Sequence, residues 1–414
     1  MAVNFLLFPP IEEVPNNPPS RFLWIVVFLV LTFLGSFFVF IFWPKGEAKQ
    51  TSWFWICLLG YPIGIAAFVV LRRYSVYEGR RLDVMAWNDA REKHIENVFD
   101  AACCPLNALA SAYRFSANES DNGVDRLLSG ALMLKAQFRG ESTTEITKSR
   151  WLAPLKEELK FIPADDHSRQ VQLMEWLVNE LLDDVSEAIR ALPSSLRVAV
   201  QVDISSDVIC SEASQIWEKC WMRHKLPRPT SVTKIKTKNL MILDQWLDRA
   251  DTSAGQEARL MVFIQLDNLL DNIPPEKSAE AGVAMLIAPV TLAEHYKLGV
   301  IANIHRPMQG RFDAINHVLE YALKWGRVTT IDVARTWKTG FDIEKSSLLT
   351  SCMMKEKIHA PSYDLDNSVG NTRKVAPWLA LACAIKVSQM KSDVQLVAHS
   401  DGDHLQLTIV APLA

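Results

Sequence analysis

Two long uncharged runs near the N-terminus constrain the chain more than any other feature. Residues 22–43 and 53–71 contain no charged side chain. A 22-residue helix is about 33 Å long, enough to cross a hydrocarbon core of about 30 Å. The alternatives are a buried hairpin and a cleaved signal peptide. A signal peptide needs a basic start and a shorter apolar region, whereas the first 20 residues contain neither Lys nor Arg. The sequence therefore predicts two membrane-spanning helices.

The charges that flank these runs predict the orientation. The loop between the runs holds two lysines, Lys45 and Lys49, and four arginines follow the second run: Arg72, Arg73, Arg80 and Arg81. Basic residues next to spans are retained on the cytoplasmic side. We therefore expect both termini in the cytoplasm and the lipid bilayer as one partner of the chain.

Charge, cysteines and motifs exclude several classes of function. The net charge is 44 − 47 = −3, so no general attraction to nucleic acid is expected. Seven cysteines without a C-x-x-C pair favour free thiols in a reducing compartment. The sequence lacks G-x-x-x-x-G-K-[ST], G-x-G-x-x-G, H-E-x-x-H and G-x-S-x-G. This argues against nucleotide-binding phosphate loops, the metal site of zincins and the nucleophile elbow of α/β-hydrolases. We expect no cofactor.

The remainder of the chain is typical of an α/β domain. Amphipathic helices are predicted over residues 80–100, 123–137 and 171–193, because apolar residues recur there at helical spacing. Short β-branched runs then alternate with helices, which indicates a mixed sheet covered on both faces. The predicted strands are 197–204, 258–266, 282–289, 298–304 and 327–334, and the predicted helices are 212–223, 239–250, 312–324 and 374–390. An Asp-Gly pair between two apolar runs near the C-terminus predicts a closing β-hairpin.

Two polar clusters have both a functional and a structural interpretation. "HSDGDH" brings His399 and His404 close to two aspartates, as in a metal site. An Asp-Gly turn forms without metal, so we favour a solvated hairpin tip and no metal. "IHRPMQGR" contains His305, Arg306 and Arg311. It can bind an anion, but a polar strand end is the more common reason for such a segment.

The order of these segments resembles the ketoacyl-synthase branch of the thiolase superfamily. "MILDQWLDRADTSAGQEARLMVFIQL" is similar to the family's nucleophile helix and the strand that follows it. "AINHVLEYALKWGRVTTIDVARTWKTG" resembles the helix and strand before the first histidine loop, and "DNSVGNTRKVAPWLALACAIKV" resembles the second histidine loop with its buried helix. The resemblance covers residues 105–414, and only loosely the part before 197. It implies a thiolase-like α/β domain, and it also implies pairing into a homodimer.

At the matching positions the sequence departs from the family's chemistry. The family uses a thiolate at a helix N-terminus with two histidines, or a His and an Asn in some branches. Here the helix opens near Lys238 and Asn239, and no cysteine lies between residues 220 and 352. The first loop, "ARTWKTG", has no histidine, and the second is Gly370-Asn371-Thr372. We therefore predict no catalytic residue, and a loop that keeps its architectural role.

A narrower resemblance suggests a function. A proline-rich start before two spans, joined to a thiolase-like domain without a nucleophile, is similar to inner-membrane proteins of bacterial type VI secretion, especially the type VI lipase adaptor family. It implies a non-catalytic adaptor in the inner membrane that recruits or loads a protein partner, such as a secreted effector. The predicted organisation is a proline-rich arm (1–21), two spans (22–71), a juxtamembrane helix (72–104) and the α/β domain (105–414).

Two alternatives remain open. One is an acyl-transfer enzyme with Cys210 or Cys220 as nucleophile. The other is an immunity protein that binds a toxin in the cytoplasm.

Overall fold

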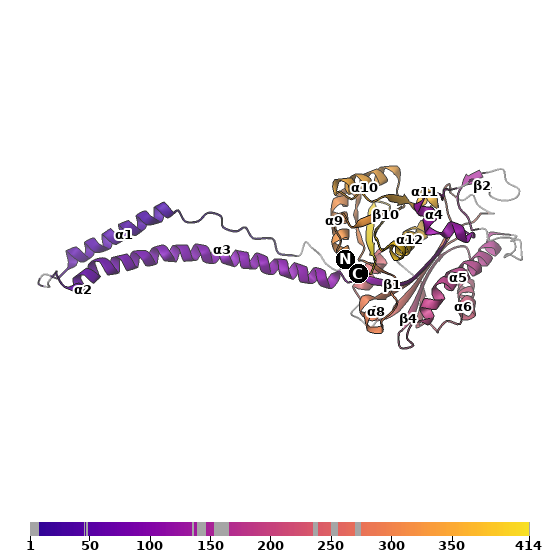
Figure 1. The fold of residues 1–414 in the computed structure, drawn as a ribbon, viewed down its shortest axis with the longest axis horizontal. Coiled ribbons are helices and arrows are strands. Elements are labelled where there is room, and N and C mark those ends of the chain that lie inside the picture. Colours follow the sequence, from indigo (N-terminus) through magenta and orange to yellow (C-terminus); the bar gives the residue numbers. More distant parts are fainter. Residues whose placement is uncertain are drawn as a thin grey trace. The chain divides into compact units, whose positions relative to one another are not determined.

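The chain forms two compact units, Asn4–Phe99 and a larger α/β domain that begins at Asp100 (Figure 1). The structure is a computed structural model. It describes residues 8–44, 46, 49–134, 136–138, 146–152, 165–234, 239–249, 256–269 and 275–413.

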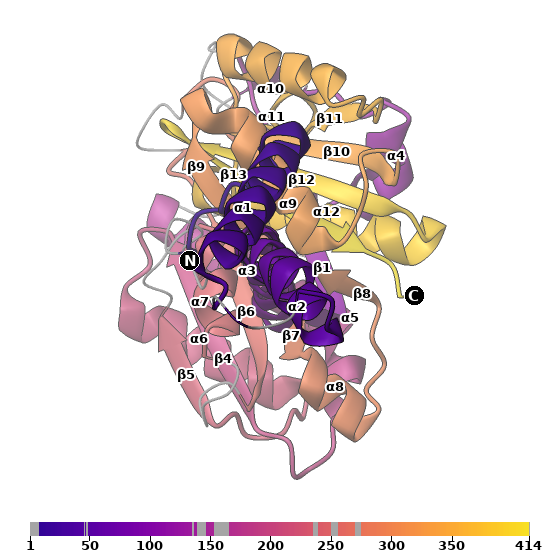
Figure 2. The same ribbon diagram turned by 90° about the vertical axis from the view of Figure 1, so that its left-hand side faces the viewer.

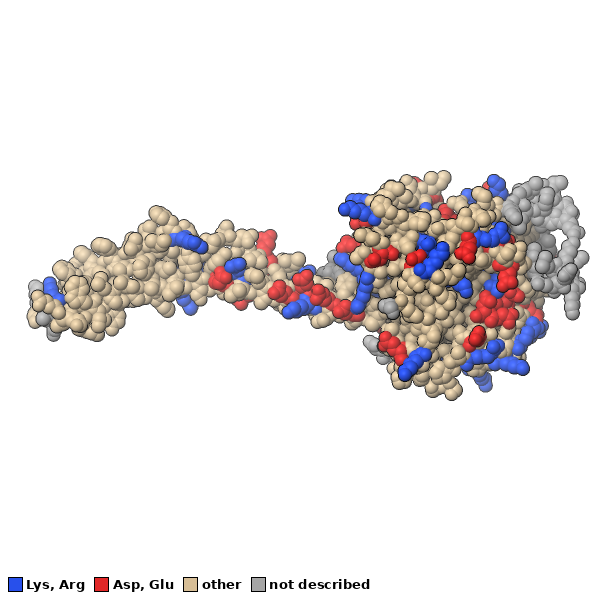
Figure 3. All heavy atoms as spheres, in the orientation of Figure 1, with Lys and Arg blue, Asp and Glu red and all other residues tan. Residues whose placement is uncertain are grey.

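The N-terminal unit consists of two long helices. Helix α1 spans Arg21–Phe42, and the short α2 (Ser52–Trp55), a π-helical turn η2 (Ile56–Gly60) and α3 (Tyr61–Ala102) follow one another without a break. Both α1 and the continuous helix Ser52–Ala102 are long and apolar enough to cross a membrane. Charged side chains are nearly absent from the surface of α1 and the first part of α3, whereas they are spread over the α/β domain (Figure 3).

Small residues and aromatic rings hold the two long helices together. A Cβ atom on Gly35 would lie 2.8 Å from the Pro62 Cβ, so only glycine permits this close approach. Ser36 Oγ donates a hydrogen bond of 2.8 Å to the Leu58 carbonyl oxygen. The rings of Trp43 and Phe54 meet edge to face at 4.9 Å, a favoured aromatic geometry.

The proline-rich arm lies along the polar part of α3. Tyr77 Oη donates to the Pro15 carbonyl oxygen at 2.9 Å, and Arg91 Nε donates to the Pro9 carbonyl oxygen at 2.5 Å. Proline has no backbone N–H, so the arm can pair with α3 only through its carbonyl groups and its few other polar atoms. The four flanking arginines, Arg72, Arg73, Arg80 and Arg81, are all exposed on α3.

The α/β domain is built in layers around one mixed sheet (Figure 1). The strands are β1 Leu106–Arg114, β4 Val198–Ser205, β5 Ser231–Lys234, β6 Ala258–Gln265, β7 Ala281–Pro289, β8 Ala302–Ile304, β9 Met308–Arg311, β10 Val333–Thr339, β11 Ser362–Asp364, β12 Val394–Asp401 and β13 His404–Ala411. The strand order is β11-β10-β12-β13-β8-β1-β7-β6-β4-β5, and β9 pairs with β13. Strands β5 and β11 therefore lie at opposite ends of the sheet (Figure 2). A separate ribbon joins β2 Ala136–Phe138 to β3 Ile146–Lys148.

Helices cover the sheet on both faces. They are α4 Val124–Leu128, α5 Asp166–Arg190, α6 Cys210–Arg223, α7 Met241–Leu247, α8 Val290–Tyr296, α9 Ile315–Gly326, α10 Ile343–Lys355, α11 Leu365–Ser368 and α12 Ala376–Lys391, with short 3-10 turns η3 Glu119–Asn122, η4 Phe312–Ala314 and η5 Arg373–Val375. Residues of α5 and α6 form one apolar cluster with strands β1, β4, β6 and β7, and residues of α4, α7 and α12 form a second cluster on the other side of β1, β6 and β7.

Helix α12 is the centre of the domain. It contacts strands β10, β12, β13, β8, β1 and β7, and 12 of its residues are buried. Its sequence, "APWLALACAI", places apolar side chains on every face before Lys386, and a helix of that kind is stable only when it is enclosed. The Trp378 ring stacks on Phe263 of β6 with ring centroids 4.1 Å apart.

The main elements predicted from the sequence are present. The mixed sheet, the predicted helices near α5, α6, α7, α9 and α12, and the C-terminal hairpin are confirmed. The helix predicted over 123–137 is wrong beyond α4, because Gly130 adopts φ +68 directly after that short helix. The strand predicted over 327–334 begins later, at Val333.

Candidate functional site

The N-terminus of α7 is where the resemblance places a nucleophile. Of the two residues predicted there, Lys238 lies outside the described residues, and Asn239 directly precedes Leu240, the N-cap of α7. Leu240 N–H donates a hydrogen bond of 3.1 Å to Oε1 of Gln406. Among the described residues, Asn239 Oδ1 is buried without a hydrogen-bond partner. The segment before α7 therefore presents an amide side chain, and the N–H of the N-cap residue is already bonded within the protein.

Gln406 connects α7 to a buried histidine. It lies on β13, is fully buried, and faces His399 of β12 as its direct cross-strand partner, so both side chains are on the same face of the sheet. The His399 ring nitrogen Nδ1 is 3.3 Å from the Thr339 carbonyl oxygen, which makes Nδ1 the donor and leaves Nε2 as an acceptor. Burial lowers the pKa of His399, so the ring is neutral near neutral pH.

The solvated hairpin tip predicted for His399 is therefore wrong. The register of the hairpin pairs Asp401 with His404, so the two-residue loop is Gly402–Asp403 and His399 lies two positions into the strand. His404 is exposed. In the part of the chain that the structure describes, no three His, Cys, Asp or Glu residues are grouped as metal ligands.

The first predicted loop lies at the end of β10, beside His399. Gly340 has φ +78, and a Cβ atom there would collide with the Ser400 carbonyl oxygen, so glycine is required. Asp366 accepts hydrogen bonds from Thr339 Oγ1 at 2.8 Å and from Gly340 N–H at 2.6 Å. Burial raises the pKa of Asp366 above its usual value. We call Asn239, Thr339, Asp366, His399 and Gln406 the α7 entrance cluster.

The second predicted loop serves as a structural bridge. Gly370 has φ +113, and an added Cβ would be 2.8 Å from the Ala279 Cβ. Asn371 N–H donates to the Lys277 carbonyl oxygen at 2.7 Å, and its own carbonyl accepts from Ala279 N–H at 3.0 Å. Thr372 is buried. The Asn371 side chain is exposed, and its Oδ1 accepts the Arg373 N–H at 2.8 Å, so this amide stabilises its own turn.

A buried ionic network that the sequence did not predict lies next to this loop. Arg373 Nη1 is 3.0 Å from Asp267 Oδ1, and the Asp267 N–H donates to Glu280 Oε1 at 2.9 Å. Arg169 of α5 binds both oxygens of Glu280, at 3.0 and 2.6 Å. The available signal was the polar pair Asp267–Asn268 directly after the apolar strand β6, since strand ends in α/β sheets carry functional side chains.

Arg306, from the segment for which a polar strand end is favoured over anion binding, is used inside the protein. Its Nη1 binds the carboxylate of Asp244 in α7. The same nitrogen lies 2.7 Å from Oδ1 of Asp248, the C-cap of α7. Its Nε donates to the Ala102 carbonyl oxygen at 3.0 Å. Arg311 is exposed and pairs with Asp313. The anion-binding interpretation is therefore replaced by a structural role: Arg306 holds α7 in place.

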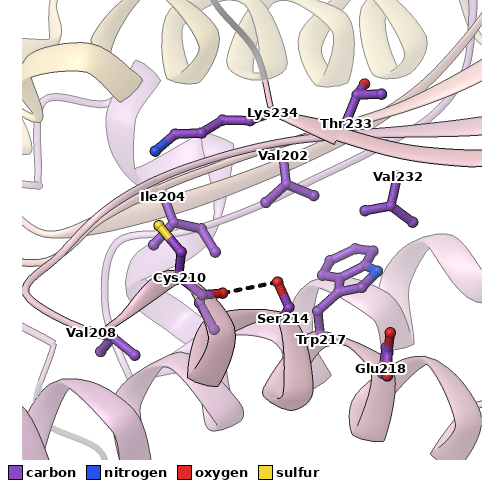
Figure 4. A pocket seen from close by; sticks show the side chains of 11 residues that line it. Val202, Ile204, Val208, Cys210, Ser214, Trp217, Glu218, Val232, Thr233 and Lys234 are labelled. Atoms are coloured by element: carbon purple, nitrogen blue, oxygen red, sulfur yellow. Dashed lines mark hydrogen bonds between the residues drawn. The ribbon is translucent and has the colours of Figure 1, made fainter.

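Among the described residues, no hydrogen bond joins a cysteine to the α7 entrance cluster. Cys220 is fully buried in α6, and burial raises its pKa to about 11. Cys383 is enclosed in α12, where burial raises its pKa to about 12. Cys210 is exposed at the first residue of α6 and lines an apolar cavity (Figure 4).

Comparison with solved structures identifies the fold. The chain is similar to the ishigamide ketosynthase/chain length factor, with a TM-score of 0.52 at 11% identity over 75% of this chain and 100% of that one. It is also similar to the ketosynthase from module 6 of the bacillaene synthase from Bacillus subtilis, with a TM-score of 0.54, 9% identity, and 75% and 72% of the two chains covered. The ketosynthase from module 1 of the Bacillus amyloliquefaciens bacillaene synthase has a TM-score of 0.52 at 10% identity, over 75% of this chain and 76% of that one. No protein-family model and no curated protein sequence matches the chain.

The α/β domain therefore has a ketosynthase-like, thiolase-type fold. At this low identity the similarity defines the fold alone. The chemistry of the entrance cluster follows from its own side chains: two amides, one neutral imidazole and a carboxyl group that binds Thr339 and Gly340. These groups are suited to hydrogen bonding, and none of them forms a thioester.

Proposed function

We propose that this chain is a membrane-anchored binding protein whose ketosynthase-like domain recruits a protein partner and does not transfer acyl groups. One observation carries the proposal: Asn239 lies just before α7, and the N–H of the N-cap residue Leu240 is bonded to Gln406. In acyl transfer a thiolate attacks the carbonyl carbon, and free N–H groups stabilise the oxyanion that forms. Among the described residues before α7, Asn239 provides an amide side chain and the Leu240 N–H is already bonded.

The second loop supports the same proposal. A histidine assists acyl transfer by moving or holding a proton near neutral pH. The Asn371 amide cannot take up a proton in this range, and its oxygen is bonded to the Arg373 N–H. The loop is suited to holding residues 277–279 against the core.

A purification experiment tests whether the chain binds a protein partner. The full chain is affinity-purified from detergent-solubilised membranes and its companions are identified by mass spectrometry. We expect one discrete protein in a stoichiometric amount. A preparation that carries covalently bound acyl groups and no protein partner would contradict the proposal.

We further propose that α1 and the first part of α3 span the bacterial inner membrane, with both termini in the cytoplasm. The support is their length and apolar composition, together with four exposed arginines after the second apolar run. A fluorescent protein that matures only in the cytoplasm, fused to either terminus, should fluoresce. Alkaline phosphatase fused at the same positions should be inactive. The opposite pattern would place the domain outside the inner membrane.

Confinement at the membrane supports recruitment physically. A binder fixed to a surface has a higher effective concentration towards a partner assembled there. The proposed assembly is a bacterial type VI secretion system, with a secreted effector as the partner, and this link rests on the sequence resemblance alone. Homodimerisation is proposed on the same ground. Survival of cells that co-express a candidate toxin would instead favour an immunity protein.

The second candidate is acyl transfer through Cys210. The observation that favours it is an exposed thiol at the edge of an apolar cavity, a place where an acyl chain can lie. Its weakness is the position: no histidine is among the described residues that line that cavity, so the Glu218 carboxylate would have to act as the base that activates the thiol. Cys220 is a poor nucleophile because it is buried with a raised pKa.

A further inference from the structure

The polar part of α3, residues 72–99, has little packing of its own. Val84 is the one side chain in this stretch that the structure describes as buried. Gly79 also lies in it, and an added Cβ atom there would meet nothing within 4 Å. An exposed glycine weakens a helix, and most helical stability in proteins comes from tertiary packing. The stability of this stretch therefore depends on what packs against it.

The proline-rich arm packs against this stretch. Residues 9–20 form neither a helix nor a strand, and Figure 1 shows the arm running beside α3 from the start of α1. Tyr74 Oη donates a hydrogen bond to the Pro19 carbonyl oxygen at 3.1 Å. Tyr77 Oη donates to the Pro15 carbonyl oxygen at 2.9 Å. Two tyrosines of α3 therefore hold the part of the arm that lies next to α1.

Two further side chains of α3 hold the part of the arm nearer the N-terminus. Asn88 pairs with the backbone of Glu12 through both halves of its amide. Its Nδ2 donates to the Glu12 carbonyl oxygen at 2.9 Å, and its Oδ1 accepts the Glu12 N–H at 3.1 Å. Arg91 Nε donates to the Pro9 carbonyl oxygen at 2.5 Å. All of these bonds reach the main chain of the arm, so α3 binds an extended backbone.

The residues of α3 that hold the arm lie on one face of the helix. Tyr74 and Tyr77 are three positions apart, Asn88 follows eleven positions later, and Arg91 is three positions further on. The buried Val84 lies between them, seven positions after Tyr77 and four before Asn88. This spacing brings the side chains to one face only if the residues between them are helical. The arm therefore binds the helical state of this stretch.

A segment that binds one conformation stabilises it against the others. Because the arm belongs to the same chain as α3, its effective concentration at this face is high. Its prolines also reduce the conformational freedom that the arm loses on binding. They are Pro9, Pro10, Pro15, Pro18 and Pro19.

We infer that the arm is a strap that keeps the polar part of α3 helical. With the strap bound, Tyr61–Ala102 is one unbroken helix. With the strap released, residues 74–95 open locally and this part of α3 becomes a flexible connector. The strap thus sets the stiffness of α3. The inference is independent of the proposed function, because it requires neither a partner nor a ligand.

Amide hydrogen exchange of the detergent-solubilised full chain, followed by mass spectrometry, tests the strap. Removing residues 2–16 deletes three of the bonded arm positions but leaves the sequence of α3 and Ser20, the N-cap of α1, unchanged. We expect residues 74–95 to exchange about tenfold or more faster without the arm, because several hydrogen bonds are lost. Exchange in β7 and α12 should stay the same.

A pair of substitutions separates the strap from helix propensity. Asn88→Ala removes both bonds to Glu12, and the matched control is Asp89→Ala at the next position, which is exposed. Alanine is a better helix former than asparagine or aspartate, so propensity alone predicts slower exchange in both variants. The strap predicts faster exchange in Asn88→Ala and no acceleration in Asp89→Ala.

Two results would overturn the inference. One is unchanged exchange of residues 74–95 after removal of the arm, which would show that α3 is stable by itself. The other is an Asn88→Ala variant that exchanges no faster than the wild type, which would show that the contacts with the arm do not stabilise the helix.

Discussion

Replacing Arg306 with methionine is expected to lower the free energy of unfolding by about 3–5 kcal/mol. The Arg306 side chain is 4% exposed and the Asp244 side chain 3%, so water cannot replace the lost partner. Methionine keeps most of the volume but removes the Arg306 cation from the buried Asp244 carboxylate and from Asp248. Both aspartates belong to α7 or its C-cap. We therefore expect α7 and the α7 entrance cluster at its N-terminus to become less rigid as well.

Pulse proteolysis in urea, on the detergent-solubilised chain, measures this change. The matched control is Arg311→Met on β9, whose side chain is 68% exposed and pairs with the exposed Asp313. An exposed pair of this kind contributes about 0–1 kcal/mol. Equal effects of the two substitutions would show that Arg306 does not hold α7.

Replacing Arg169 with methionine is expected to have a similar effect, also about 3–5 kcal/mol. Glu280 is fully buried and receives four hydrogen bonds: two from Arg169, one from Leu152 N–H and one from Asp267 N–H. The backbone donors remain in the variant, but the one cation that the described residues place at the carboxylate is removed. Arg169 also donates to the carbonyl oxygens of Asp267 and Leu152, so these acceptors lose a donor too.

The pH dependence distinguishes this mechanism from a loss of packing. Burial raises the pKa of Glu280, and removing Arg169 raises it further. A carboxyl group whose pKa is higher in the folded than in the unfolded state binds more protons when folded, so its contribution to stability increases as the pH falls. The difference between variant and wild type should therefore shrink as the pH falls from about 8 to about 5. A difference that stays constant over this range would contradict the argument.

Patterns local in sequence predicted much of the fold. The uncharged runs became α1 and the continuous helix made of α2, η2 and the first part of α3, and "APWLALACAI" became the enclosed helix α12. The all-apolar strand at 282–289 is β7, in which every residue is buried. In these segments the local sequence pattern alone predicts the secondary structure, and the tertiary contacts stabilise the same structure.

Features that depend on distant residues were not predicted. Strand β1, "LNALASAYR", is rich in leucine and alanine, which favour helix, and it is a strand because β7 and β8 pair with its two edges. His399 looked like part of a solvated tip, but the register with Gln406 places it inside the sheet. The positions around Asn239 and Gly370–Thr372 were identified through the family resemblance. The hydrogen bonds of these segments to Gln406, Lys277 and Ala279 join residues that are distant in the sequence. The periodicity of a local segment cannot predict such contacts.

The central claim is that this ketosynthase-like domain binds without forming an acyl-enzyme. Intact-mass spectrometry of the purified full chain, after incubation with medium- and long-chain acyl-CoA, tests it most directly. Cys210→Ser is the matched control, because Cys210 is the exposed thiol that lines a cavity. The account predicts an unmodified mass for the wild type and for the variant. One acyl group per chain, located on a single cysteine and lost on reaction with hydroxylamine, would contradict it.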